Sequence, residues 1–146
     1  MHDLQIMRKA NHSDINSIFG IEKDVFKEEN WSHNMIHNSI SDIATTTYVI
    51  EELENIVAYC MVKITDNEFE IINFAVAPLF QRKGRGKLIL ESFLKQIPIN
   101  SSVFLEVKKS NAAAINLYNS TGFQIINIRY NYYKDGSDAF VMCFNK

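Results

Sequence analysis

Apolar residues gather in seven segments of strand length, separated by polar turns or by helical patterns. The segments are rich in β-branched and aromatic residues, which favour strands. In one of them Val103, Leu105 and Val107 alternate with Phe104 and Glu106, so Glu106 is expected on the opposite face of its strand. The expected strands are residues 4–7, 46–51, 56–65, 69–76, 103–107, 124–132 and 138–145.

Four further segments repeat apolar residues every three to four positions, which predicts amphipathic helices. Glu22 is the polar exception on the first of them, and Pro98 ends the third, which is expected over 87–97. The apolar positions are Ile15, Ile18, Phe19, Val25, Phe26, Met35, Ile36, Ile40, Leu90, Phe93, Leu94 and Ile97. Candidate N-terminal caps are Asn11 or Ser13, Ser32, and Ser110 or Asn111 for a last helix over 112–120, and Gly122 is its expected left-handed C-terminal cap.

The order of these elements predicts one mixed sheet. Short turns join the strands 46–51, 56–65 and 69–76, which therefore form an antiparallel meander. A helix separates 69–76 from 103–107, so these two strands are expected to be parallel. The 146 residues contain no linker or repeat, and we expect a single domain (1–146) of the α/β (α+β) class, a mostly antiparallel sheet flanked by helices.

The segment 81–86, Gln-Arg-Lys-Gly-Arg-Gly, lies between an expected strand and a helix. Two glycines let successive N–H groups point into one concavity, and the helix start adds free N–H groups and a positive dipole end. Arg82, Lys83, Arg85 and Lys87 lie where this dipole disfavours cations by a few tenths of a kcal/mol each. A bound polyanion would offset that repulsion; the alternative is a solvated basic turn. The glycine spacing fits neither a Rossmann fingerprint nor a phosphate-binding P-loop.

Composition excludes several other classes of protein. A formal charge of −2 argues against a general nucleic-acid binder, which needs a net basic face. No apolar run approaches the roughly 18 residues of a membrane-spanning helix, and the N-terminal residues lack a signal-peptide pattern, so we expect a soluble cytoplasmic protein without a membrane partner. Cys60 and Cys143 lie in apolar strands and are expected to be reduced, buried thiols.

The loop 81–86 resembles the Q/R-x-x-G-x-G/A pyrophosphate loop of the Gcn5-related N-acetyltransferase (GNAT) family, and the order of elements is that of the same family. The resemblance implies a sheet splayed between its two central parallel strands, with acetyl-CoA as co-substrate in the gap and no metal. It implies that Gln81, Arg82, Lys83, Gly84, Arg85 and Gly86 hold the pyrophosphate, and that backbone groups of Phe74, Ala75 and Val76 bind the pantetheine arm and the thioester.

Acetyl transfer to an amine needs a proton acceptor and a proton donor for the thiolate. Glu106, a carboxylate inside an apolar strand, is the candidate base, although an exposed edge position would also explain it. The segment 105–118 resembles L-E-V-R-x-S-N-x-x-A-x-x-L-Y of the RimI-type ribosomal-protein alanine N-acetyltransferases. That match implies Glu106 as proton acceptor, Tyr118 as proton donor and Asn111 as a coenzyme contact. Taken alone, Tyr118 reads as a half-buried aromatic and Asn111 as a helix cap.

Residues 129–142 resemble the N-Y-Y and D-G-x-x-D-A-x-x-M pattern of the same subfamily. By that resemblance Tyr132 and Tyr133 roof an acceptor cleft, although they could form an ordinary aromatic cluster. Trp31 either lines the substrate pocket or staples the second helix to the core, and Asn30 stands where the subfamily usually has proline. A strong Asp-Gly turn signal, Asp135-Gly136, joins the last two strands.

The leading hypothesis is direct acetyl transfer from acetyl-CoA to a protein N-terminal amine, with a ribosomal protein as the target that the resemblance implies. One alternative is an acetyltransferase for a small-molecule amine or a lysine side chain, and another is a non-catalytic acyl-CoA-binding module. Loss of Glu106 or Tyr118 would have favoured the last, and both are present. The sequence leaves the acceptor and the oligomeric state open.

Overall fold

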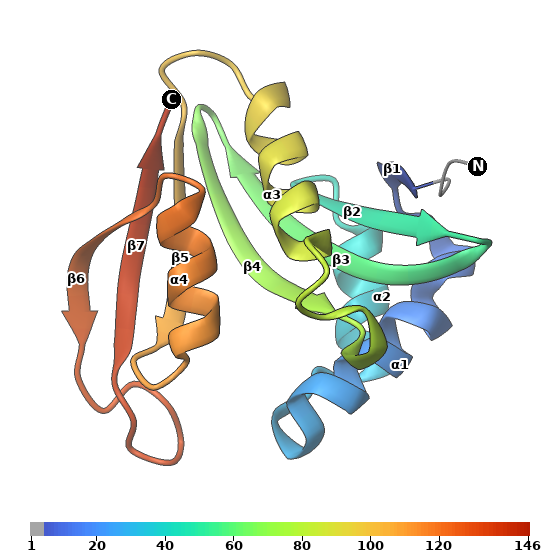
Figure 1. Ribbon diagram of the computed structural model, residues 1–146, viewed down its shortest axis with the longest axis horizontal. Helices are drawn as coiled ribbons and strands as arrows, with labels where there is room; N and C mark the ends of the chain where they lie inside the picture. Colours follow the sequence, from blue (N-terminus) through green and yellow to red (C-terminus); the bar gives the residue numbers. More distant parts are fainter. Residues whose placement is uncertain (1–4) are drawn as a thin grey trace.

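Seven strands form one sheet in the order β1-β2-β3-β4-β5-β7-β6, with helices on both faces (Figure 1). The computed structural model describes residues 5–146, so Leu4 of the first expected strand lies outside the described residues. The strands are β1 Gln5–Lys9, β2 Thr45–Glu52, β3 Asn55–Thr65, β4 Glu68–Val76, β5 Ser102–Lys108, β6 Gln124–Arg129 and β7 Ala139–Asn145. The α-helices are α1 Ile15–Phe26, α2 His33–Ser41, α3 Arg85–Gln96 and α4 Ala112–Ser120, and the short 3-10 helices are η1 His12–Asp14, η2 Lys27–Glu29 and η3 Pro78–Phe80.

The predicted mixed topology is confirmed. Strands β1 to β4 form an antiparallel meander, β4 and β5 are parallel, and β7 pairs antiparallel with both β5 and β6. The parallel ladder joins four residue pairs, from Glu68 with Ser102 to Ile71 with Leu105. Beyond that last pair β4 and β5 diverge, as Figure 1 shows, and the expected splay is confirmed.

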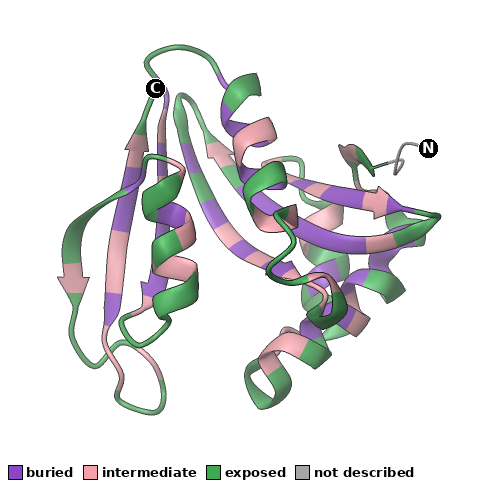
Figure 2. Cartoon of the chain, in the orientation of Figure 1, coloured by how far each residue is buried: buried purple, intermediate pink, exposed green. Residues whose placement is uncertain are grey.

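Two apolar clusters cover the two faces of the sheet, with the buried residues running along β3 (Figure 2). The larger cluster joins α3 and α4 to the sheet through residues such as Phe93, Leu105 and Phe123. The smaller cluster joins α1 and α2 to the opposite face through Ile18, Ile36 and Met61. The apolar stripes predicted from periodicity therefore lie against the sheet, because burying them removes apolar surface from water.

Capping residues fix the starts of the first and last helical segments. Asn11, and not Ser13, caps η1, which leads directly into α1, and Asn11 forms a reciprocal capping box with Asp14. Asn111 caps α4 by accepting a hydrogen bond from the Ala114 N–H. Gly122 has φ +104° just after α4, which confirms the predicted left-handed cap.

Two of the element boundaries that differ from the prediction have a clear cause in the backbone. Helix α3 begins at Arg85 rather than at residue 87, because Gly84 adopts a left-handed conformation (φ +81°) and serves as its N-cap. Strand β6 ends at Arg129 rather than at Tyr132. Asn131 there takes a positive φ of 50°, and the N–H groups of Tyr132 and Tyr133 bond to the Ser137 carbonyl, which turns the chain out of the sheet.

Candidate active site

Glu106 is the first residue of β5 after the ladder with β4 ends. Val103, Leu105 and Val107 are buried in the cluster with α3 and α4, so the pleat directs Glu106 to the opposite face, as predicted. Its Oε1 lies 3.5 Å from Nε of Arg129, and its Oε2 is buried without a hydrogen-bond donor among the described residues. The Glu106 side chain as a whole is 24% exposed, although its Oε2 atom is buried.

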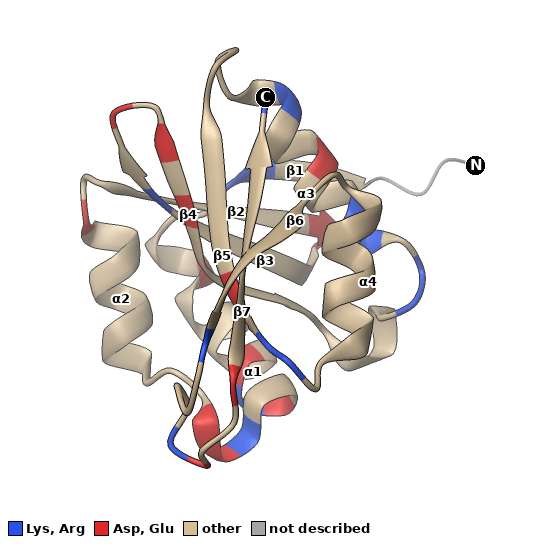
Figure 3. Cartoon of the chain, turned by 90° about the vertical axis from the view of Figure 1, so that its left-hand side faces the viewer, with Lys and Arg blue, Asp and Glu red and all other residues tan. Residues whose placement is uncertain are grey.

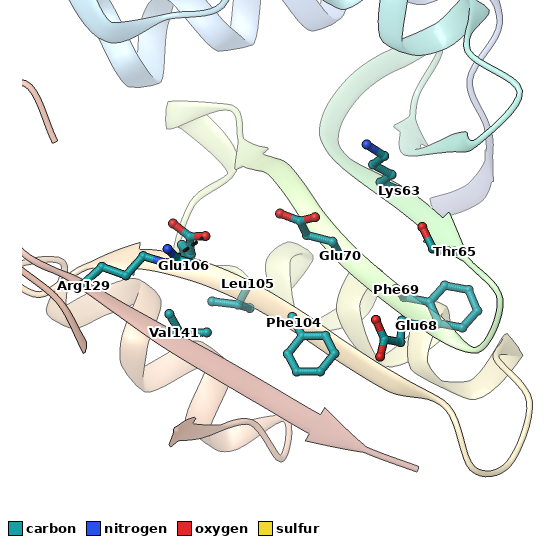
Figure 4. Close-up of a pocket in the computed structure, with 10 residues that line it drawn as sticks. All are labelled: Lys63, Thr65, Glu68, Phe69, Glu70, Phe104, Leu105, Glu106, Arg129 and Val141. Carbon is teal, nitrogen blue, oxygen red and sulfur yellow. Dashed lines mark ion pairs between the residues drawn. The ribbon is translucent and has the colours of Figure 1, made fainter. Parts of the chain in front are cut away.

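A cavity of about 250 Å³ opens beside Glu106 on this face (Figure 4). Its wall comes from β3, β4, β5, β6 and β7, and it spans the point where β4 and β5 part. In Figure 4 Glu106 and Glu70 extend from the two diverging strands, with Arg129 beside Glu106. The cavity is lined by Lys63, Thr65, Glu68, Phe69, Glu70, Phe104, Leu105, Glu106, Arg129 and Val141.

Tyr132 and Tyr133 lie in the loop between β6 and β7, close to Glu106. Their rings meet edge to face with centroids 5.2 Å apart, and the Arg129 guanidinium lies 5.5 Å from the centroid of Tyr132. A side-chain hydrogen bond to Glu106 first, and then burial, raise the pKa of Tyr132, whereas burial first and then the charge of Glu106 raise the pKa of Tyr133. Both predicted acceptor-side tyrosines are therefore beside the candidate base.

Lys108 anchors the same loop. Its ammonium group pairs with Glu29 at 3.0 Å and with Asp135 at 3.3 Å, and it lies 5.1 Å from the centroid of the Tyr133 ring. The loop is thereby attached to β5 and to η2, which precedes α2.

Tyr118 approaches the splay from the other face of the sheet. It projects from α4 into the cluster of α3 and α4, where its ring centroid lies 6.1 Å from Phe74 and 5.8 Å from Phe123. Burial raises the pKa of the Tyr118 hydroxyl, which therefore remains protonated at neutral pH. The candidate donor and the candidate base are on opposite faces, and the gap between β4 and β5 lies between them.

The end of β4 presents backbone groups to this gap. The Ala77 N–H bonds to the Val57 carbonyl on β3, so strand alternation directs the peptide groups of Ala75 toward β3 and those of Phe74 and Val76 into the gap. In this structure the Phe74 N–H donates to its neighbour Asn73 Oδ1 at 2.9 Å. Gln81 Nε2 donates to the Val76 carbonyl at 3.0 Å, so side-chain amides satisfy both groups.

The loop 81–86 leads from η3 into α3, and its basic residues are visible as blue segments in Figure 3. A Cβ atom placed on Gly86 would lie 3.1 Å from Leu117 of α4 and 3.4 Å from Phe74 of β4. Any larger residue at this position would therefore crowd the side chains of Leu117 and Phe74 where α3, α4 and β4 converge. Arg85 is paired with Glu52 of β2, with Nε to Oε2 at 3.0 Å and Nη2 to Oε1 at 2.5 Å.

The remaining predicted residues have visible structural roles. Asn111 caps α4, and its own N–H bonds to the Lys108 carbonyl. Trp31 is half-buried against the cluster of α1 and α2 that contains Ile36, as the staple interpretation requires. The backbone N–H of Trp31 donates to Oε1 of Glu22 at 3.1 Å. A coenzyme contact for Asn111 and an acceptor contact for Trp31 stay predictions.

Sequence reasoning missed three polar partners of the site. Arg129 pairs with Glu106, Glu52 pairs with Arg85, and Asn73 bonds to Glu22. Glu22 could have been recognised as a residue in need of a polar partner, because it is the polar exception on an apolar helix face. Arg129 and Glu52 are charged residues at the ends of strands, where charged side chains are common. Nothing in the sequence around them therefore indicated that they pair with residues of the site.

These features define an acetyltransferase of the GNAT class: residues 12–123 match the family described as the acetyltransferase (GNAT) family, and the chain belongs to it. Over 129 residues it is 35% identical to the [ribosomal protein bS18]-alanine N-acetyltransferase of Haemophilus ducreyi, covering 85% of this chain and 87% of that protein. It is also similar to two solved structures. The ribosomal-protein-S18-alanine N-acetyltransferase of Escherichia coli has a TM-score of 0.87 at 28% identity, covering 97% and 93% of the two chains. Ard1 of Thermoplasma volcanium has a TM-score of 0.82 at 27% identity, covering 95% of each chain. The resemblance drawn from the sequence is confirmed.

Proposed function

We propose that this acetyltransferase moves the acetyl group of acetyl-CoA directly to the N-terminal α-amine of a protein, with ribosomal protein S18 as the target named for its relatives. The observation that carries the proposal is the Oε2 atom of Glu106, which is buried and has no hydrogen-bond donor among the described residues. Glu106 lines a cavity at the point where β4 and β5 diverge. A buried carboxylate oxygen without a donor is costly unless a ligand supplies one. An acceptor amine in the cavity would do so.

Acetyl-CoA would lie in the gap on the side of α3 and α4. Its pyrophosphate would bind the backbone N–H groups of the loop 82–86 and of the first turn of α3, next to Arg82 and Lys83. Gly86 supports this fit, because a Cβ there would crowd the side chains of Leu117 and Phe74, which line the gap on this side. The pantetheine arm would take the backbone groups of Phe74 and Val76, displacing the amides of Asn73 and Gln81.

Glu106 and Tyr118 would handle the two protons of the reaction. Glu106 accepts the proton that the acceptor nitrogen loses, directly or through water, as nitrogen bonds to the acetyl carbon and the carbon–sulfur bond breaks. Tyr118 gives its phenolic proton to the departing thiolate, and solvent later restores it. Burial raises the pKa of the Tyr118 hydroxyl, so the group is protonated when the thiolate forms, and the same shift makes it a weaker acid.

The environment of the two cysteines also supports direct transfer in a single ternary complex, without an acetyl-cysteine intermediate. Cys60 is fully buried, and burial raises the pKa of both Cys60 and Cys143. A thiol must ionise to act as a nucleophile, so neither is suited to carry the acetyl group.

The acceptor side favours an α-amine. Tyr132 and Tyr133 lie beside Glu106, and a chain terminus can enter such a cleft end-on, whereas an internal lysine brings backbone on both sides. An α-amine has a pKa near 8 and lysine one near 10.4, so deprotonating the α-amine at pH 7 costs roughly 3.4 kcal/mol less.

One experiment tests this assignment. A peptide with a free N-terminus and one internal lysine is reacted with acetyl-CoA, and the acetyl group is located by mass spectrometry. We expect the label on the N-terminal residue, and no product from a matched peptide whose N-terminus is blocked. Predominant lysine labelling would contradict the N-terminal assignment while leaving the acetyltransferase class intact.

A further inference from the structure

The Arg85 side chain folds back over the loop that carries it. Its Nη1 donates to the Lys83 carbonyl at 2.9 Å, and its guanidinium carbon lies 5.9 Å from the centroid of the Phe80 ring. Its Nε and Nη2 donate to the two carboxylate oxygens of Glu52 at 3.0 and 2.5 Å. Three of its nitrogens are therefore engaged with the loop and with the end of β2.

This ion pair is shielded, unlike the other ion pair at the start of α3. The side chains of Arg85 and Glu52 are 14% and 7% exposed, whereas Lys87 and Glu91 are 53% and 44% exposed at a separation of 3.7 Å. A bidentate, shielded guanidinium–carboxylate pair fixes two chain segments relative to one another, while an exposed lysine pair contributes little.

One residue of the loop has an unfavourable backbone conformation, which a restraint would help to hold. Arg82 has φ +61°, a left-handed conformation that is unfavourable for a residue with a Cβ, whereas Gly84 takes φ +81° at no steric cost. Glu52 offers a fixed anchor, because it ends β2 two residues after the fully buried Ile50 and pairs with Asn55 of β3. The Arg85 side chain thus connects a strained loop to the rigid sheet.

We propose that Arg85 is a positioning residue for the coenzyme loop: with Glu52 it holds residues 82–86 in the conformation that receives the pyrophosphate of acetyl-CoA, and it is not itself a phosphate ligand. This deepens the proposed function and rests on it, since it takes the loop as the acetyl-CoA site. The Glu52 carboxylate also neutralises the charge of Arg85, one of the cations crowded around the helix start. From the sequence alone we expected a bound polyanion to offset that repulsion. Phosphate binding is left to the backbone N–H groups, Arg82 and Lys83.

The two possible roles of Arg85 predict opposite effects of changing Glu52. If Arg85 positions the loop, Arg85→Met and Glu52→Gln should each weaken acetyl-CoA binding about tenfold or more, measured by titration calorimetry. The double variant should be no weaker than the weaker single variant, because both changes remove the same contact. If Arg85 binds phosphate, Glu52→Gln should leave affinity unchanged or tighten it, while Arg85→Met weakens it. That result would overturn the proposal.

Controls separate positioning from general damage and from failure of the proposed function. Glu91→Gln, which removes the exposed carboxylate on α3, should keep wild-type affinity, and in the Arg85 and Glu52 variants the KM for the acceptor peptide should not rise with that for acetyl-CoA. Without ligand, amide hydrogen exchange across residues 82–86 should be faster in both single variants than in the wild type. Unchanged exchange would overturn the proposal. A wild type that binds no acetyl-CoA would refute the proposed function, and the exchange result would still decide whether Arg85 holds the loop.

Discussion

The hydroxyl group of Tyr59 donates a hydrogen bond to the carboxylate of Glu22, and both side chains are buried. Asn73 Nδ2 donates to the two oxygens of the same carboxylate at 3.0 and 3.1 Å, and the Trp31 N–H donates at 3.1 Å. Donors from β3, β4 and the segment before α2 thus satisfy the buried carboxyl group of Glu22 on α1. The network fixes the segment that carries Trp31 relative to the strand that lines the gap.

Tyr59→Phe should lower the free energy of unfolding, because it removes one donor and leaves a buried carboxylate partly unsatisfied. The expected loss is about 1–3 kcal/mol, measured by urea denaturation. Burial and the Glu22 charge raise the pKa of Tyr59, so the loss should not vary with pH across the neutral range. Tyr130→Phe, at a position that is 71% exposed, is the matched control and should change stability little. Equal stability of the two variants would contradict the role of the network.

Glu106→Gln should retain the fold and lose the proton acceptor. We expect kcat/KM to fall about 10²- to 10⁴-fold at pH 7, the usual contribution of a general base. The residual activity should rise with pH as more acceptor amine is deprotonated in solution, so the deficit should shrink above pH 8. A deficit of the same size at every pH would indicate that Glu106 only shapes the cavity.

Tyr118→Phe keeps the ring in contact with Phe74 and Phe123 and deletes the hydroxyl group. If the hydroxyl protonates the thiolate, kcat should fall by about 10²- to 10⁴-fold while the melting temperature changes little. Acetyl-CoA binding, measured separately, should also change little, because the ring remains. Wild-type turnover in this variant would reduce Tyr118 to a packing residue.

Gly86→Val should separate the walls of the gap, since its side chain would meet Leu117 and Phe74. Acetyl-CoA at a hundred times its dissociation constant should stabilise the wild type by about 2.7 kcal/mol, and most of this should be lost in the variant. Gly20→Ala is the control, because a Cβ there meets nothing within 4 Å and Gly20 lies inside α1. It should keep the full ligand effect and stabilise the fold by up to about 1 kcal/mol. An unchanged ligand effect in Gly86→Val would place the coenzyme elsewhere.

Asp14→Asn should destabilise the protein at neutral pH but much less in acid. The Arg8 guanidinium, 2.7 Å away, lowers the pKa of Asp14, so this pair contributes stability above the unfolded pKa of about 3.9 and loses it as pH falls through the folded value. Urea denaturation at pH 7 and at pH 3 would measure the difference between variant and wild type. A difference that grows toward pH 3 would reverse the expected sign.

The order of elements was predictable because periodicity, short turns and the helical crossover are local signals, whereas the splay was expected only from the resemblance to the GNAT family. The side-chain networks were not. Arg85 and Glu52 are 33 residues apart, and Glu22 meets residues 37 and 51 positions away, so sheet pairing has to form before these contacts exist. The early start of α3 depends on the left-handed Gly84, and the segment after Arg129 leaves the strand through backbone bonds to Ser137. The tyrosines of this segment favour a strand, which is why the sequence predicted that β6 would continue to Tyr132. The backbone hydrogen bonds of the turn end the strand at Arg129 instead.

The four-residue ladder between β4 and β5 makes the sheet two leaves joined along a short seam. Peptide groups of Phe74 and Val76 beyond the seam bond to side-chain amides of their own segment, so separating the leaves breaks no backbone ladder there. A ligand that takes over these groups would complete the sheet as an additional strand would. In the ligand-free protein the two leaves should therefore move apart transiently beyond the seam. Acetyl-CoA binding should suppress this motion, and slower amide exchange at Phe74 and Val76 would show it.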